Sequence, residues 1–281
     1  MKNNIFHEGE YYIQEKMGVR NSSDSLSSIV KSTIPKIAKD FLENLNFSCI
    51  TISTHNEDLH TFLVYGIDKF IKVINEREIL VDLKNHSFIP DFLIDIRKIN
   101  IAFIGLDFER KMRVRINGNG EFKNDILIIN INEIYSNCPK YISKKILSKK
   151  LKISTNKSIE IIPEIDYNLK KLISNLDTFF IASSHKEKGL DVSYKGGKKG
   201  FLKVKSKTQL EFDDLPGNNF FNSIGNIYTN PYINILIIDF ENSITYHLKA
   251  KAKIMGDDIL KITANCYEIL INKNSFLLDY K

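Results

Sequence analysis

The sequence predicts a mainly β protein made of two similar halves, each with antiparallel strands and a flanking helix. The apolar runs, such as INILII at 233–238, have the length of strands. Two segments, 70–83 and 201–212, each show a strand, a polar turn and a second strand. The order helix, strand, hairpin occurs twice in the 281 residues, which is enough chain for two domains of ordinary size.

Residues 1–31 are predicted to be a polar leader with one short helix at best. The first clear helix is expected near 33–46, where apolar residues recur at helical spacing. Thr33 should cap this helix, and Pro35 should lie in its first turn, where the missing N–H costs nothing. The strand SCITIST at 48–54 and then the first hairpin follow.

The second half repeats this order, with a helix near 164–176, the strand TFFIASS at 178–184 and the second hairpin. Identical residues align at nearly constant offsets of 130, 131 and 132. The aligned pairs are Ser53 with Ser183, Phe70 with Phe201, and Asp107 with Asp239. Chance matching is the competing explanation, because Lys, Ile and Phe are abundant. The repeated order of elements favours an internal repeat.

The boundary between the halves is predicted near 150–162, where a polar and basic stretch ends at Pro163. The predicted organisation is a leader at 1–31, a first half at 32–152 and a second half at 153–281. The lysine-rich end of the first half is predicted to be a basic helix with a solvated face.

Composition narrows the function classes. There are 40 basic and 34 acidic residues, and a net charge of +6 is too small to indicate nucleic-acid binding. The three cysteines are far apart and form no CxxC, so neither a disulfide framework nor a zinc site is indicated, and a reduced, cytoplasmic setting is expected. The N-terminus lacks an apolar signal region, and no apolar run approaches the roughly 20 residues of a membrane helix.

Common catalytic and metal motifs are missing, because the sequence contains no HExxH, no GxxxxGKS/T and no GxSxG. The six histidines are scattered, and no close pair suggests a metal, so no metal site is predicted. No residue is assigned a catalytic role.

A glycine-rich cluster, DVSYKGGKKGF at 191–201, has the composition of a phosphate site. Glycines let the backbone approach a ligand closely, and lysine, serine and free N–H groups suit a phosphate dianion. The candidate residues here are Ser193, Lys195, Gly197 and Lys198. An ordinary glycine-rich hairpin with solvated lysines is the alternative.

A second cluster, LPGNNFFNSIGNIYTNP at 215–231, is rich in amides and hydroxyls beside an apolar strand. Amide side chains both donate and accept hydrogen bonds, which suits the edge of a heterocycle or a phosphate. The candidates are Asn218, Asn222, Ser223 and Asn226. Ordinary turn and helix-cap chemistry is the alternative.

Together, TFFIASS, DVSYKGGKKGF, GNNFFNSIGN and NPYINILIIDF resemble the flavin-binding core of the pyridoxamine-5'-phosphate-oxidase-like split-barrel proteins. FHEGEYYIQEKMGV at 6–19, ERKMRVRING at 109–118 and NCPKYI at 137–142 resemble a two-half subfamily of predicted flavin-nucleotide-binding proteins. The resemblance implies tandem split β-barrels of antiparallel strands, with FMN bound at the barrel–barrel interface. It also implies a pseudo-dimer within one chain, and it allows a homodimer.

The first half has lost the phosphate-type residues of the second. Its counterparts of Ser193, Lys195 and Asn222 are Phe62, Val64 and Asp91. Conversely, the first half carries Arg113, Arg115 and Asn117, which point to one face of a strand. Arginine forks bind anions strongly, although an exposed basic strand face is the alternative.

We therefore expect one composite FMN site per chain. The second half would supply the phosphate cradle, and the first half would supply Arg113 or Arg115 from across the interface. The segment NCPKYI follows the first barrel, and it is expected to close over the flavin with Asn137, Lys140 and Tyr141.

The resemblance implies an FMN-binding flavoprotein, and we expect a flavin-dependent oxidoreductase whose flavin is reduced by a nicotinamide or another donor. True pyridoxamine-phosphate oxidases carry a C-terminal substrate-binding segment with Arg and Trp. This chain ends in NKNSFLLDYK and contains no Trp, so that particular activity is not expected. The alternatives are a non-enzymatic flavin or haem carrier or sensor, and a degenerate barrel that serves as an interaction module.

Overall fold

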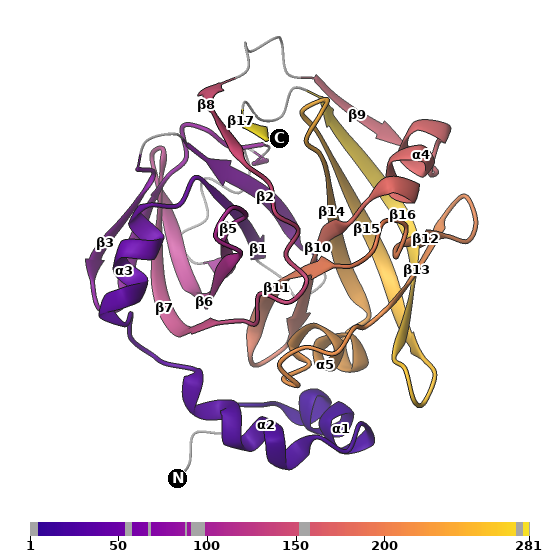
Figure 1. The fold of residues 1–281 in the computed structure, drawn as a ribbon, viewed down its shortest axis with the longest axis horizontal. Coiled ribbons are helices and arrows are strands. Elements are labelled where there is room, and N and C mark those ends of the chain that lie inside the picture. Colours follow the sequence, from indigo (N-terminus) through magenta and orange to yellow (C-terminus); the bar gives the residue numbers. More distant parts are fainter. Residues whose placement is uncertain are drawn as a thin grey trace.

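Two antiparallel sheets stand side by side in the computed structural model, which describes residues 5–53, 58–66, 69–87, 89–90, 99–151, 158–273 and 278–280 (Figure 1). The first sheet has the order β2-β1-β5-β6-β7-β4-β3, with β1 (Phe47–Ser53), β2 (His60–Tyr65), β3 (Ile71–Asn75), β4 (Glu78–Asp82), β5 (Ile99–Asp107), β6 (Met112–Lys123) and β7 (Ile126–Ser136). The second sheet has the order β11-β10-β14-β15-β16-β13-β12, with β10 (Thr178–His185), β11 (Gly189–Gly196), β12 (Lys203–Val204), β13 (Gln209–Asp213), β14 (Tyr232–Asp239), β15 (Ile244–Met255) and β16 (Lys261–Lys273). A further strand, β9 (Ser158–Ile162), pairs with β16.

The strand order confirms the internal repeat and the tandem split-barrel fold. Each strand of the first sheet has a counterpart at the same place in the second sheet. Even the β-bulge recurs, after Asn117 on β6 and after Lys249 on β15. Both predicted hairpins are present, as β3 with β4 and as β12 with β13.

The strand register corrects one detail of the alignment. Ile52 faces His60 on the neighbouring strand, where Ser183 faces Asp191, so the offset on these strands is 131. The counterpart of Ser183 is therefore Ile52, and the expected match with Ser53 is wrong by one residue. An error of one residue inverts the facing of a side chain, because side chains alternate along a strand.

Strands β1 and β10 are buried along their whole length, which explains why their sequences do not alternate between apolar and polar residues. On β1, Ile50 belongs to the core of its own barrel, while Cys49 belongs to a cluster between the halves. On β10, Phe179 and Phe180 divide in the same way. The cluster between the halves draws on both sheets, so the two barrels pack directly against each other.

The two helices expected from periodicity are present as α3 (Lys36–Glu43) and α4 (Tyr167–Asn175), each shorter than predicted. The predicted cap is wrong, because Pro35 and not Thr33 is the N-cap of α3, and no side chain caps the helix. Proline disfavours helical backbone at the residue before it, here Ile34, so the helix starts later. Within the described residues, no helix has the length and apolar character needed to cross a membrane.

The leader is more structured than predicted. It contains α1 (Glu8–Lys16), α2 (Arg20–Leu26) and a short 3-10 turn (Ser27–Ile29), so the expectation of one short helix at best is wrong. These helices lie beneath α5 (Asn222–Thr229) in the view of Figure 1. Tertiary packing supplies most of the stability of short helices, and a polar local sequence gives little sign of it.

The lysine-rich end of the first half also differs from its prediction. Instead of a basic helix, Leu147–Leu151 form strand β8, which pairs with β17 (Leu278–Tyr280). Pairing with a strand from the far end of the chain overrides the local helical pattern. The predicted boundary between the halves falls partly on residues 152–157, which lie outside the described residues, and it stays a prediction.

Candidate functional site

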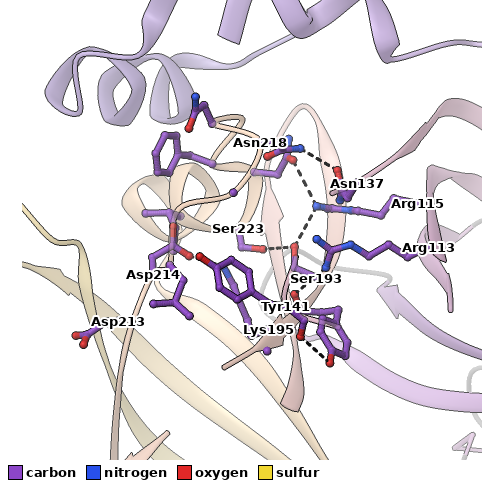
Figure 2. Close-up of a pocket in the computed structure, with 18 residues that line it drawn as sticks. Arg113, Arg115, Asn137, Tyr141, Ser193, Lys195, Asp213, Asp214, Asn218 and Ser223 are labelled. Atoms are coloured by element: carbon purple, nitrogen blue, oxygen red, sulfur yellow. Dashed lines mark hydrogen bonds and ion pairs between the residues drawn. The ribbon is translucent and has the colours of Figure 1, made fainter. Parts of the chain in front are cut away.

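A cavity of about 110 Å³ opens between the halves, where β6 and β11 approach each other (Figure 2). The segment after β7, residues 213–221 and the first turn of α5 complete its wall. The predicted site residues that line it are Arg113, Arg115, Asn137, Tyr141, Ser193, Lys195, Asn218, Asn222 and Ser223. The fold thus brings together candidates from both halves of the chain.

Arg113 brings an unneutralised positive charge to this cavity. Its guanidinium donates to the backbone carbonyl oxygens of Tyr194 (3.3 Å) and Cys138 (2.7 Å). Its Nε is buried without a hydrogen-bond partner, and no carboxylate within the described residues forms an ion pair with it. Burial, and then the neighbouring Arg115, lowers the pKa of Arg113 to about 10, so the group stays charged at neutral pH.

Arg115, on the same face of β6, is engaged by the protein itself. It forms a buried ion pair with Asp191 of β11, and it donates to Ser193 Oγ (3.0 Å). Ser223 of α5 donates in turn to Ser193 (2.8 Å). This network joins β6, β11 and α5, and it leaves Arg115 with less free charge than the sequence suggests.

Lys195 also has a partner. Its Nζ lies 2.6 Å from Oδ1 of Asp214, which lines the cavity on the side opposite the arginines (Figure 2). Both side chains are largely buried. The predicted phosphate cradle therefore contains a carboxylate that competes for the Lys195 ammonium group.

We expect Asp214→Asn to strengthen the binding of inorganic phosphate or FMN by about tenfold, since a hydrogen bond to a charged group contributes about 1.5 kcal/mol. The physical reason is that Lys195 would no longer be neutralised by a neighbouring carboxylate. Asp213→Asn is the matched control, because Asp213 lines the same cavity and is not the partner of Lys195. Titration of both variants measures the effect, and equal changes in both would contradict a specific competition at Lys195.

The first turn of α5 forms part of the cavity wall. Its N-cap residue, Phe221, has a left-handed backbone (φ 58°) and supplies no side-chain cap. Asn222, Ser223 and Ile224 of the first turn all line the cavity. The first N–H groups of a helix lack partners within the helix and lie at the positive end of its dipole, so they favour an anion.

A second, larger cavity of about 550 Å³ adjoins the first and shares Tyr141 and Leu215 with it. Phe201 and Ile142 give it apolar walls. The remaining predicted site residues here are Lys140, Gly197 and Lys198. An aromatic and apolar wall beside an anion pocket suits a ligand with a planar ring at one end and a phosphate at the other.

Gly196 allows the segment after β7 to close over this region. A Cβ atom at Gly196 would lie 2.1 Å from the carbonyl oxygen of Tyr141, so only glycine permits this approach. The hydroxyl of Tyr194 also donates to the same carbonyl (3.2 Å).

Two predicted residues lie behind the cavity wall instead of on it. Asn117 and Asn226 each donate from Nδ2 to the Asp191 carboxylate, at 2.9 Å. Neither lines the two cavities described above. Both amides thus position the Asp191 carboxylate, which forms the ion pair with Arg115.

The pseudo-equivalent place on the other side of the interface is built differently. By strand register, Thr245 and His247 on β15 occupy the positions of Arg113 and Arg115 on β6. Likewise, Phe62 and Val64 on β2 occupy the positions of Ser193 and Lys195 on β11. Phe62 and Val64 are fully buried. Burial lowers the pKa of His247 to about 4, so it is neutral at physiological pH. Asp91, the expected counterpart of Asn222, lies outside the described residues.

Three carboxylates that shape the site were not among the sequence-predicted residues: Asp191, Asp214 and Glu10. Asp191 could have been predicted, because it lies two residues before Ser193 on the same strand and therefore shares its face. Asp214 follows a strand end, and Glu10 comes from the leader to accept a hydrogen bond from Asn222. No local pattern indicates either of these two contacts.

His7 and His185 are far apart in the sequence but stack in the structure, with ring centroids 4.0 Å apart, and their spacing in the sequence gives no sign of this pair. Together with Glu8, their candidate ligand atoms lie within 4.8 Å of one another. However, Nδ1 of each ring accepts backbone N–H groups, which places the ring proton on Nε2. Metal-binding histidines usually donate from the nitrogen that does not bind the metal. The observed hydrogen bonds therefore suit a stacked contact of the two rings better than a metal site.

No family model and no curated protein matches this chain, but several solved structures are similar to part of it. The chain is similar to HupZ of Group A Streptococcus (16% identity, 37% of this chain, 91% of that chain, TM-score 0.31). It is also similar to a protein from Lactobacillus delbrueckii assigned as a pyridoxamine 5'-phosphate oxidase (12%, 38%, 94%, 0.32) and to an FAD-binding protein from Mesorhizobium loti (7%, 41%, 97%, 0.28). At these TM-scores the likenesses carry no argument about ligand or activity. The split-barrel fold rests on the strand order of the chain itself.

Proposed function

We propose that the chain is a flavoprotein that binds one FMN between its two halves, which act as the two protomers of a pseudo-dimer. The observation that carries the proposal is that one cavity is lined both by Arg113, which has no carboxylate partner among the described residues, and by the first turn of α5, which no side chain caps. A phosphate group carries the negative charge and the acceptor oxygens that these donors lack.

The adjoining larger cavity would take the isoalloxazine ring. Its wall contains Tyr141 and Phe201, and aromatic side chains pack favourably against a planar ring. The exposed lysines Lys140 and Lys198 lie at the same cavity and would meet the polar edge of the ring or an anionic second substrate.

A single site per chain follows from the unequal halves. The pseudo-equivalent place has buried Phe62 and Val64 where the site has Ser193 and Lys195, and these apolar side chains offer no donor to a phosphate. Neutral His247 stands in the place of Arg115. Burial of a phosphate dianion there would be strongly unfavourable.

An FMN-dependent oxidoreductase is the activity that we propose for this flavoprotein. Bound FMN would supply the hydride or electron chemistry, while the residues of this chain bind it, orient it and exclude water. The electron donor would be a nicotinamide or another reduced compound. A flavin carrier or sensor with the same site is the second candidate. It is favoured by the network around Arg115, because the contacts of Arg115 with Ser193 and Asp191 can bind and position a ligand but assign no proton donor to a substrate.

The proposal is tested by reconstituting the purified protein with excess FMN and measuring bound flavin per chain. We expect about one FMN, with the absorption spectrum of a protein-bound flavin. Two FMN per chain would contradict the composite site, and no FMN would contradict the flavoprotein. Reduction of the bound flavin by NADH or NADPH would favour the oxidoreductase, whereas a flavin that neither reduces would favour the carrier.

A further inference from the structure

The N-terminal helices pack on the element that forms part of the anion cavity. α1 crosses α5 so closely that a Cβ atom on Gly9 would lie 2.3 Å from the carbonyl oxygen of Gly225. Beside this crossing, Tyr12 stacks on Tyr228 with ring centroids 4.2 Å apart. Figure 1 shows α1 and α2 together beneath α5. The leader therefore contacts the helix whose first turn lines the cavity.

The polar contacts of this leader also end on the cavity wall. Its side chains bond to three residues where the chain enters α5. Ser23 donates to the carbonyl oxygen of Asn219 (2.9 Å), Gln14 donates to that of Phe220 (3.1 Å), and Glu10 accepts from the side chain of Asn222. Within this segment, Asn219 and Phe221 have left-handed backbones (φ 65° and 58°). A bulky residue such as Phe221 adopts this conformation only when its surroundings impose it.

Asn222 connects the leader to the cavity. Its Oδ1 accepts hydrogen bonds from Arg115 (3.4 Å) and from the hydroxyl of Tyr135 (3.2 Å), while its Nδ2 donates to Glu10. The side chain therefore has one end on the leader and the other on the network of the cavity. Loss of the leader contact would free Asn222 to turn, and it would remove support from the first turn of α5.

We propose that the leader is a clamp on the anion cavity, such that docking of α1 on α5 and binding of a phosphate-bearing ligand at the first turn of α5 stabilise each other. This inference rests on the proposed function, because FMN is the ligand that we assign to the cavity. The coupling is reciprocal, so a ligand that tightens the docking must also bind more tightly to the docked form.

Glu10 also makes the clamp sensitive to pH. Burial, and then the nearby Asp191, raises the pKa of Glu10 from 4.5 to about 8 when it is docked. An undocked Glu10 would ionise at its ordinary pKa, so docking weakens as the pH rises from 4.5 to 8. For His7 the pKa is lowered from 6.5 to about 4 by burial and by His185, so docking also weakens as the pH falls below 6.5.

The environment of Glu10 contains both signs of charge. The charged and titratable groups around it are His7 and Glu8 on its own segment, Arg115 on β6, Glu133 on β7, His185 on β10, Lys188 before β11, and Asp191 on β11. In the range from pH 6.5 to 8, Glu10 dominates, because His7 is already neutral there. The clamp should therefore loosen over this range.

Glu10→Gln tests the link while preserving α1. A glutamine can still accept from the backbone N–H of His7 and so keep the capping box, which tolerates either residue. Its amide NH2 group would then face the NH2 group of Asn222, and the hydrogen bond between the leader and the cavity would be lost. Glu15→Gln is the matched control, because Glu15 lies on the same helix with its side chain 69% exposed.

The readouts are hydrogen exchange of residues 8–26 and the FMN affinity, both in the full-length protein. FMN should slow the exchange of this segment, and inorganic phosphate should act in the same direction. In the unmodified chain, the FMN affinity should fall roughly fivefold between pH 6.5 and 8, the lower end of couplings between linked sites. Glu10→Gln should remove this decline, because glutamine does not titrate, whereas Glu15→Gln should keep it.

The outcomes separate this proposal from the one it rests on. If FMN binds but neither FMN nor inorganic phosphate changes the exchange of residues 8–26, the clamp is overturned and the flavin site stands. If the chain binds neither FMN nor phosphate, both proposals are overturned. A decline with pH that persists in Glu10→Gln would overturn the role of Glu10 in the pH response.

Discussion

Replacing Arg115 by Met is expected to lower the free energy of unfolding by about 3–5 kcal/mol, the usual cost of removing one partner of a buried ion pair. The side chains of Arg115 and Asp191 are only 4% and 11% exposed, so water cannot replace the lost partner. The change leaves the Asp191 carboxylate buried without its cation, and it removes a donor from Ser193. Urea unfolding at pH 7 measures the loss.

A second substitution separates the charge effect from the loss of packing. We expect the double variant Arg115→Met, Asp191→Asn to be more stable than Arg115→Met alone, because no buried charge is then left unpaired. Arg110→Met is the control on a nearby arginine, since Arg110 is largely exposed (69%) and should change stability by less than about 0.5 kcal/mol. A loss of under about 1 kcal/mol for Arg115→Met would contradict the role of the buried pair, given the range above.

Arg113→Met should act on binding more than on folding. We expect the affinity for FMN and for inorganic phosphate to fall about 10- to 100-fold, since a hydrogen bond to a charged group contributes about 1.5–3 kcal/mol. The reason is that, among the described residues, Arg113 donates only to the backbone carbonyls of Tyr194 and Cys138, so its charge is available to a ligand. Titration followed by flavin fluorescence measures the change, and urea unfolding checks that the fold is retained.

Charge and geometry can be distinguished at this position. Arg113→Lys keeps the charge but loses the planar fork, so its affinity should lie between those of the unmodified chain and Arg113→Met. Binding should also weaken with added salt, and less steeply in Arg113→Met, because one charge contact is missing. The same Arg110→Met control should bind normally, since Arg110 does not line the cavity. Unchanged affinity in Arg113→Met would show that the anion site lies elsewhere.

Much of the architecture could be predicted from the sequence, because it follows from local periodicity and from repetition. The helical spacing before each first strand, and the polar turns of the two hairpins, are local properties, and both α3 and α4 lie where they predict. The unequal composition of the halves indicated candidate residues on both, and Ser193 on β11 and Arg113 on β6 line one cavity. They can do so because the two repeated barrels pack directly against each other.

The sequence alone determined the repeat, the mainly β class and the chemical character of the site, because these depend on residue types and their spacing. Only the tertiary structure decided which charges remain free. Lys195 and Arg115 look as available as Arg113 in the sequence, yet Asp214 and Asp191 neutralise them. The docking of the leader on α5, and the pairing of strand β8 with β17, were likewise decided only by the tertiary structure. Each depends on a contact between segments far apart in the chain, and the free energy of such a contact arises from burial and pairing that no local pattern records.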